Sequence, residues 1–474
     1  MSGLVGFVIL YLLASIAIGL FAATRVKNSS DYANAGRSLP LYIVIATVFA
    51  TWFGSETVLG ISARFVQDGL RGVIEDPFGS SMCLILVGLF FARKLYRMNL
   101  LTIGDYYRQR YSRTVEILVA LCIVISYLGW VSAQITALGL VFNVLSQGAI
   151  SLAMGMILGA AIVLFYTLFG GMWSVALTDF FQMTIIVVGL LYIAYVVSGL
   201  AGGAHKVIAH AAAAGKFNFA PELTSKDILA FIAAWVTMMF GSIPQQDVFQ
   251  RVMSAKTETT GAVGSITGGS LYFLFAFIPM FLAYSASLID PHMVQSLIDK
   301  DTQMILPTLI LNHAPLFAQV MFFGALLSAI MSTASGTLLA PSITLTENVL
   351  REIFPMNDRQ MLLTTRIVVV SFAIAVTSFA LASQGMAIYD MVGNAYKVTL
   401  VAAFVPLVMG LYWKRASAQG ALFSVIGGLA TWLLMERFGA ASIWPPQLVG
   451  LLAGFVAMIA GSLLPQYAVK PAAA

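Results

Sequence analysis

The chain has 474 residues, of which 60% are apolar and only 9% are charged. One membrane-spanning helix takes roughly 20 mostly apolar residues, so the apolar residues would supply at most about fourteen spans. This composition excludes a soluble globular protein and predicts an all-α integral membrane protein embedded in the lipid bilayer. The net charge of +5 does not indicate a nucleic-acid partner, because the basic residues are scattered in short clusters between apolar runs.

Motifs of enzymes and metal centres are absent from the sequence. Cys83 and Cys122 lie inside apolar runs, which argues against a disulfide framework or a zinc site. The four histidines lack metal-ligand spacing, and neither HExxH nor GxSxG occurs. We therefore expect no catalytic residues, no enzymatic activity and no obligate protein partner.

The first apolar stretch, residues 3–24, is too long and wrongly flanked for a cleaved signal peptide, so we expect it to be the first span. Glycine, proline and charged clusters divide the rest into twelve further spans, which makes about 13 in all. We expect these spans at 40–63, 74–92, 115–144, 148–169, 172–199, 227–250, 262–288, 315–346, 365–383, 387–412, 419–435 and 444–464.

An odd number of spans places the two termini on opposite sides of the membrane. Most lysine and arginine residues fall in loops that are cytoplasmic if the N-terminus is outside. We therefore expect a multi-pass protein of a bacterial-type inner (plasma) membrane, with its N-terminus outside and its C-terminus in the cytoplasm.

Two expected spans are interrupted in the middle by Phe-Gly-Ser, at residues 53–55 and 240–242, and Pro244 follows the second interruption. The interrupted spans are five apart, so a second unit of five helices would be inverted relative to the first. Broken helices in matching positions of inverted repeats are typical of secondary transporters. Glycine and proline are also common in ordinary membrane helices, but their occurrence as a pair favours the transporter.

Six segments resemble the sodium:solute symporter family, and the choline-transporter branch most closely: SSDYANAGRSLP, LLTIGDYYRQRYSR, YTLFGGMWSVALTDFFQ, GSIPQQDVFQRVMSAK, GALLSAIMSTASGTLLAPS and GLYWKRASAQGALFSVIGG. The resemblance implies one transporter domain with the leucine-transporter-like five-plus-five inverted repeat. It places the first repeat at 40–199 and the second at 227–412. One helix precedes the repeats, and two extra helices follow at 419–464.

The resemblance also implies a sodium site. Its ligands would be the carbonyls of Ala50, Phe53 and Ala329 and the hydroxyls of Ser332 and Thr333. Sodium is a hard cation that prefers oxygen ligands, and broken helices offer free carbonyls. Hydroxyls in membrane helices also bond back to their own helix, but the concentration of hydroxyls in SAIMSTASGT favours an ion site.

Some family members bind a second sodium ion, and Asp179 and Ser335 match part of that site. Gly336 stands where those members carry a further hydroxyl, so we expect a sodium-to-solute ratio of one. We also expect Gly336→Ser to create a second, weaker ion site. Asp179 is alternatively a relay for ion exit or an acceptor for backbone amides.

Candidate solute-binding residues surround the two interruptions. Trp52 and Glu56 flank the first, Trp130 and Gln134 lie on the fourth span, and Gln245 lies at the second. Aromatic faces beside a carboxylate suit a cationic ligand. Packing or interfacial anchoring is the alternative role of the two tryptophans.

The choline branch has aromatic residues at the positions of Trp52 and Trp130, and it also has them where this chain carries Gln245 and Ser80. These two replacements favour a ligand other than choline itself. We therefore expect a sodium-coupled symporter that imports an amine-bearing, quaternary ammonium or zwitterionic solute by alternating access. An organic acid or a sugar as the solute, or a channel or membrane sensor on the same scaffold, are the alternatives.

Four further charged residues lie in or beside the expected spans. Asp76 precedes Pro77, a pattern typical of a helix N-cap. Glu75 has no assigned role. Asp390 and Lys397 lie two helical turns apart, and we expect them to neutralise each other or their neighbours.

Overall fold

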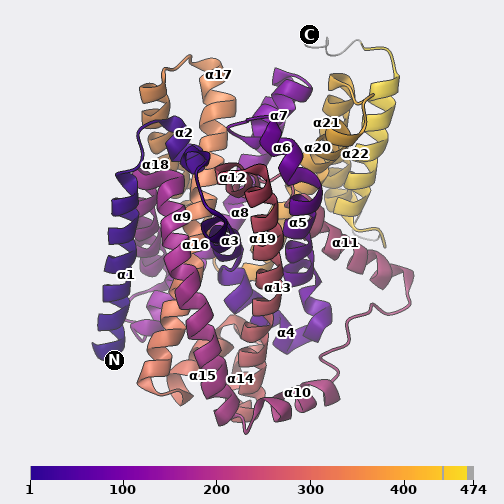
Figure 1. Cartoon of the computed structure of the whole chain (residues 1–474). Coiled ribbons are helices and arrows are strands. Elements are labelled where there is room, and N and C mark those ends of the chain that lie inside the picture. Colours follow the sequence, from indigo (N-terminus) through magenta and orange to yellow (C-terminus); the bar gives the residue numbers. More distant parts are fainter. Residues whose placement is uncertain (1, 440–441, 467–474) are drawn as a thin grey trace.

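The computed structural model of the chain describes residues 2–439 and 442–466, and over these residues it is helical without a named strand. The long helices form one bundle, with shorter helices gathered at its two ends (Figure 1). Helices α21 and α22 pack against each other at one edge of the bundle. The all-helical membrane architecture expected from the composition is confirmed.

The α-helices differ widely in length, from single turns to one helix of 49 residues. They are α1 (Ser2–Ala23), α2 (Ser29–Asn34), α3 (Leu41–Trp52), α4 (Ser62–Asp68), α5 (Ser80–Leu86), α6 (Ala92–Arg97), α7 (Ile103–Arg110), α8 (Arg113–Leu145), α9 (Leu152–Leu200), α10 (Ala204–Ala213), α11 (Ser225–Gly241), α12 (Gln246–Ser254), α13 (Glu258–Ile289), α14 (Pro291–Ile298), α15 (Ile305–His313), α16 (Leu316–Leu345), α17 (Arg351–Ile353), α18 (Asp358–Ala382), α19 (Ile388–Thr399), α20 (Val405–Tyr412), α21 (Ala418–Phe438) and α22 (Pro446–Leu463).

Ten helices of the described chain are long and apolar enough to cross a membrane, or eleven if the bent pair α11 and α12 is one span. The number differs from the expected 13 because several expected spans are not separate helices. Helix α9 covers two of them, with a kink at Gly171, where φ is 50°. Glycine adopts this positive φ without steric cost. Helix α3 is apolar but only 12 residues long.

Both expected interruptions are present. Helix α3 ends at Trp52, and the chain resumes at Glu56 as a π-helical segment, η2 (Glu56–Ile61), which continues into α4. Helices α11 and α12 meet at an angle of 44°. Residues 467–474 of the C-terminal tail expected in the cytoplasm lie outside the described residues.

Close helix packing holds the first broken helix in place. Helix α3 packs against α9, α13 and α16. Glycines on α13 allow the approach, because a Cβ atom on Gly264 would lie 2.5 Å from Val44 and one on Gly268 would lie 2.7 Å from Val48. Interior packing leaves no room for such added atoms. The α3 backbone is therefore fixed up to the point where the helix ends.

A polar cluster ties three elements together at the end of the bundle that we expect to be cytoplasmic. Asn348, in the π-helical segment η7 (Thr346–Leu350), donates to Asp105 of α7 and to Glu116 of α8, at 2.9 Å each. It also accepts from Thr102 at 2.8 Å. Buried polar groups are stable in the interior only when they are hydrogen-bonded in this way.

We predict that Asn348→Ala destabilises the protein. The change leaves the buried Glu116 carboxylate, only 1% exposed, without the amide that donates to it. The expected loss is about 1–3 kcal/mol in the free energy of unfolding, read as a lower thermal midpoint of the detergent-purified protein. Asn218→Ala, at an exposed position, is the control. Equal midpoints for the two variants would contradict the structural role of Asn348.

Candidate functional site

The first interruption lies directly against α16. Ala50, Ser332 and Thr333 are all fully buried, and the Thr333 hydroxyl lies 3.5 Å from the Ala50 carbonyl oxygen, toward which it donates. A Cβ atom on Gly54 would lie only 2.6 Å from that hydroxyl. The structure therefore brings expected ion ligands from the first broken helix and from α16 into one place.

The other two expected sodium ligands flank this place. Phe53 is the C-cap residue directly after α3, with φ −87° and ψ 70°, and its N–H still donates to the Phe49 carbonyl. Ala329 is fully buried on α16, one turn before Thr333. The Ala50 and Phe53 carbonyls thus belong to the last turn and the end of a helix, where carbonyls lack intrahelical partners.

The Asp179 carboxylate lies beside this group of oxygens. Its Oδ1 accepts from the Ser332 hydroxyl at 2.7 Å. Its Oδ2 accepts from the hydroxyls of Thr47 and Thr51 on α3, the latter at 3.4 Å. A negative charge therefore stands one hydroxyl away from the expected sodium ligands, which favours a cation there.

Sequence reasoning did not single out Thr47 and Thr51. Their spacing of four residues, which places both hydroxyls on one helix face, was the available signal. Ser335, expected beside Asp179, donates instead to the Ser332 carbonyl at 3.0 Å. Its hydroxyl therefore bonds back to its own helix, which is the alternative that intramembrane hydroxyls always offer.

Three aromatic rings pack against one another beyond the first interruption. The ring centroids of Trp52 and Trp130 lie 5.6 Å apart, and those of Trp52 and Tyr396 lie 6.0 Å apart. Trp130 and Tyr396 complete the set at 5.4 Å. All three side chains are buried. We call these three residues the aromatic box; Tyr396, on α19, was not identified from the sequence.

The Glu56 carboxylate lies at the edge of the aromatic box and is 3% exposed. Its Oε1 accepts from the Trp130 indole at 3.0 Å, and its Oε2 accepts from the Gln134 amide at 2.6 Å. The Gln134 oxygen in turn accepts from the Ser55 backbone N–H at 3.0 Å. Four of the five expected solute-binding residues are thus brought together: Trp52, Glu56, Trp130 and Gln134.

Gln245 belongs to a separate hydrogen-bonded set next to the box. Its amide donates to Ser126 of α8 at 3.0 Å and to Thr399 of α19 at 3.3 Å. Ser126 lies one turn before Trp130, and Thr399 lies three residues after Tyr396. Gln245 therefore lies close to the aromatic box but does not hydrogen-bond to Glu56.

The backbone at Asp76 is that of the predicted N-cap, because φ −138° and ψ 121° are extended and Pro77 follows. The side chain has other partners than in an ordinary cap. Asp76 is 2% exposed and accepts from the hydroxyls of Ser80 and Tyr272, and it makes no capping bond to a backbone amide. A buried carboxylate takes whatever donors the neighbouring helices offer. Glu75 lies against Gly393 of α19, where a Cβ atom would stand 2.4 Å from its carboxylate oxygen.

Asp390 and Lys397 do not pair with each other. Asp390 forms an ion pair with Arg64 of α4, and Lys397 lies 3.9 Å from Glu436 of α21. The sequence analysis allowed for such neighbours. The Arg64–Asp390 pair connects the segment that follows the first interruption to α19.

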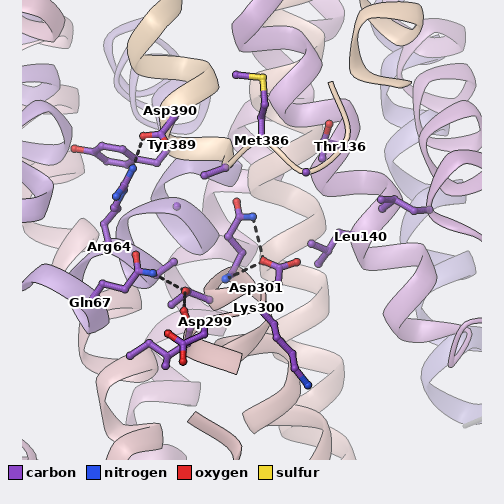
Figure 2. A pocket seen from close by; sticks show the side chains of 18 residues that line it. Arg64, Gln67, Thr136, Leu140, Asp299, Lys300, Asp301, Met386, Tyr389 and Asp390 are labelled. Carbon is purple, nitrogen blue, oxygen red and sulfur yellow. Dashed lines mark hydrogen bonds and ion pairs between the residues drawn. The ribbon is translucent and has the colours of Figure 1, made fainter. Parts of the chain in front are cut away.

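A polar cavity of about 350 Å³ is lined by residues of η2 and α4, the segment that follows the first interruption (Figure 2). Gly60 of η2, one turn beyond Glu56, lines it. The Arg64–Asp390 pair forms one wall, and Asp299, Lys300 and Asp301 form another. We call this cavity the polar vestibule.

A broken helix whose interruption lies among hydroxyls is typical of secondary transporters. The model of the sodium:solute symporter family matches residues 32–428. The chain therefore belongs to the sodium:solute symporter family and is a sodium-coupled transporter, not an enzyme.

Relatives and solved structures agree with this assignment. The chain is 28% identical to the high affinity choline transporter 1 of Homo sapiens, over 90% of this chain and 76% of that protein. It is 26% identical to the osmoregulated proline transporter OpuE of Bacillus subtilis, over 98% and 95%. The structure of a Na⁺-coupled sialic acid symporter superimposes with a TM-score of 0.82 at 20% identity, covering 98% of each chain, which shows a shared fold.

We predict that Ser332→Ala and Thr333→Ala each weaken sodium binding about tenfold or more, because each removes an expected oxygen ligand. Ser332→Ala also removes the hydroxyl that donates to Asp179. Thr337→Ala is the matched control, since that hydroxyl lies on the same helix but bonds back to the Thr333 carbonyl at 2.7 Å. Sodium titration of the thermal midpoint measures the effect. Equal sodium affinity in all three variants would remove the site from this position.

Proposed function

We propose that the protein imports a small cationic organic solute, an amine or a quaternary ammonium compound, together with sodium by alternating access. The observation that carries the proposal is the buried Glu56 carboxylate at the edge of the aromatic box. Aromatic faces attract an ammonium group, by about 2 kcal/mol when the site is desolvated. The carboxylate offsets the charge of the solute.

The same site disfavours the alternatives. A sugar would leave Glu56 without a cationic partner in a low-dielectric interior, and an organic anion would be repelled by it. Several relatives of the chain are choline transporters, which supports a cationic solute. Gln245, next to the aromatic box, makes these surroundings more polar than an all-aromatic cage, so the proposed solute carries a further hydrogen-bonding group.

Sodium is proposed to bind the carbonyls of Ala50, Phe53 and Ala329 and the hydroxyls of Ser332 and Thr333. Support comes from the burial of Ala50, Ser332 and Thr333 and from the contact of α16 with the end of α3. The interruption would couple the two ligands, because Ala50 and Phe53 flank Trp52 in the chain. Sodium that orders the end of α3 would also order the aromatic box.

Two features of the sequence analysis complete the proposal. The inverted repeats at 40–199 and 227–412 would supply the two halves that move relative to each other. The protein would lie in the plasma membrane with its N-terminus outside, so that the polar vestibule near Asp299 faces the outside and sodium enters down its gradient.

A zwitterionic solute is the second candidate. Two relatives are named as proline transporters, and the amino end of α12, with Gln245 at its N-cap, lies close to the aromatic box. Amino ends of helices bind carboxylates. Such a solute would place its ammonium on Glu56 and its carboxylate toward α12.

We predict that choline analogues and other small amines compete best for uptake into proteoliposomes that have an inward sodium gradient. Sugars and organic acids should compete less well. Trp52→Ala should weaken apparent affinity by about 2 kcal/mol, roughly thirtyfold, and Glu56→Gln should weaken it for cations more than for neutral solutes. Trp432→Ala, in the extra helix α21, is the control. Accumulation above the outside concentration distinguishes a transporter from a channel.

If sugars or organic anions compete best and Glu56→Gln has no effect, the cationic solute is wrong although sodium-coupled transport stands. If amino acids compete best, the zwitterionic candidate replaces it.

A further inference from the structure

A second buried carboxylate, that of Asp247, lies next to the aromatic box. Asp247 is in the first turn of α12, directly after the second interruption, and is fully buried. Its Oδ1 accepts from the Tyr127 hydroxyl of α8, and its backbone N–H donates to the same hydroxyl oxygen at 2.9 Å. Its Oδ2 has no hydrogen-bond partner among the residues that the structure describes. One oxygen of a buried carboxylate is therefore left without a donor.

Tyr127 joins this carboxylate to the aromatic box. Its ring stacks on that of Trp130, with centroids 5.9 Å apart and an angle of 18° between the planes. The Trp130 indole in turn donates to Glu56. Tyr127 and Trp130 lie three residues apart and so share one face of α8. This face of α8 therefore holds two buried carboxylates, one beside each interruption.

Further unpartnered polar atoms lie around the two interruptions. The Tyr396 hydroxyl is buried and has no hydrogen-bond partner in the described part of the chain, and Asp247 and Glu56 both act on it electrostatically. The buried hydroxyls of Ser55, at the first interruption, and Ser242, at the second, also lack a partner there. Native proteins leave few buried polar groups unpaired. These atoms indicate groups that a bound solute would satisfy.

The buried cation on α12 does not satisfy the free oxygen of Asp247. Arg251 interacts electrostatically with the Asp247 carboxylate. Its Nη1, however, donates to the backbone carbonyl of Asp247 at 3.2 Å, and its Nη2 donates to the Thr51 hydroxyl at 2.7 Å. The Oδ2 atom therefore remains available to a ligand.

The chemistry of this atom selects the group that fits it. A carboxylate oxygen only accepts hydrogen bonds, so Oδ2 of Asp247 needs a donor. An ammonium group provides a donor together with the opposite charge, and a charge-assisted hydrogen bond is roughly twice as strong as a neutral one. A carboxylate on the solute would instead be repelled.

We infer that the solute is a diamine, with one ammonium group on Glu56, the other on Asp247, and its hydrocarbon chain against the aromatic box. The inference rests on the proposed function, because it takes Glu56 and the aromatic box as the solute site. It disfavours the zwitterionic candidate, because a carboxylate directed toward α12 would meet Asp247.

Isothermal titration calorimetry of the purified full-length protein in sodium buffer tests the inference with four solutes of equal chain length. Each carries an amine at one end. The other end is an ammonium group in putrescine, a hydroxyl group in aminobutanol, a methyl group in butylamine and a carboxylate in γ-aminobutyrate. We expect putrescine to bind about tenfold to hundredfold more tightly than butylamine, because it adds one hydrogen bond to a buried charge. Aminobutanol should fall between these two, and γ-aminobutyrate should bind most weakly.

Asp247→Asn tests the contact itself. Asparagine keeps an oxygen for the Tyr127 hydroxyl but replaces Oδ2 with an amide group that donates. This variant is expected to bind putrescine and butylamine with nearly equal affinity. Asp358→Asn, the same change at an exposed position of α18, is the control and should keep the native preference.

Three results would each overturn the inference: native protein that binds butylamine or aminobutanol as tightly as putrescine, native protein that binds γ-aminobutyrate most tightly, or a folded Asp247→Asn variant with an unchanged preference. If the asparagine variant does not fold, the four affinities of the native protein decide. Binding of choline but of none of the four solutes would overturn the inference and leave the proposed function standing. Absence of binding by all four solutes and by choline would overturn the proposed function itself.

Discussion

An interrupted helix in the interior of a membrane protein must satisfy the backbone groups that the interruption frees, and the rest of this site depends on how it does so. Around residues 53–55, side chains from neighbouring helices supply the partners. The Ser55 N–H donates to Gln134 of α8, and the Thr57 hydroxyl donates to the Trp52 carbonyl at 3.2 Å. The Thr333 hydroxyl of α16 lies 3.5 Å from the Ala50 carbonyl. Two of the residues that stabilise the interruption, Gln134 and Thr333, are therefore also residues of the proposed ligand sites.

The interruption also separates two kinds of electrostatic environment. On one side, Glu56 is held by an indole and an amide beside aromatic faces, which suits an organic cation. On the other side, Asp179 is held by hydroxyls, which suits a hard inorganic cation. In the proposed function, two ligands with like charge would bind near each other because each would have its own buried carboxylate.

The sequence was sufficient to locate the features that local chemistry determines. Phe-Gly-Ser occurs twice within apolar stretches at matching positions, and this pattern predicted two interrupted helices. Both interruptions are present, at residues 53–55 and 240–242. Four of the five expected solute-binding residues meet, and two of these four, Trp52 and Glu56, lie beside the first interruption. The count of separate helices was less predictable, since a glycine such as Gly171 can bend a helix without ending it.

Contacts between distant segments were decided only by the tertiary structure. Tyr396 completes the aromatic box from α19, and Arg251 reaches Thr51 from 200 residues away. The carboxylate of Asp76, at a position that the local pattern assigned to a helix cap, accepts a hydrogen bond from Tyr272 across 196 residues. A sequence pattern shows which faces are apolar and where a helix is interrupted. The partner of a buried charge, by contrast, is set by which helices pack together, and that depends on small residues such as Gly264, Gly268 and Gly336, whose role is to let another element come close.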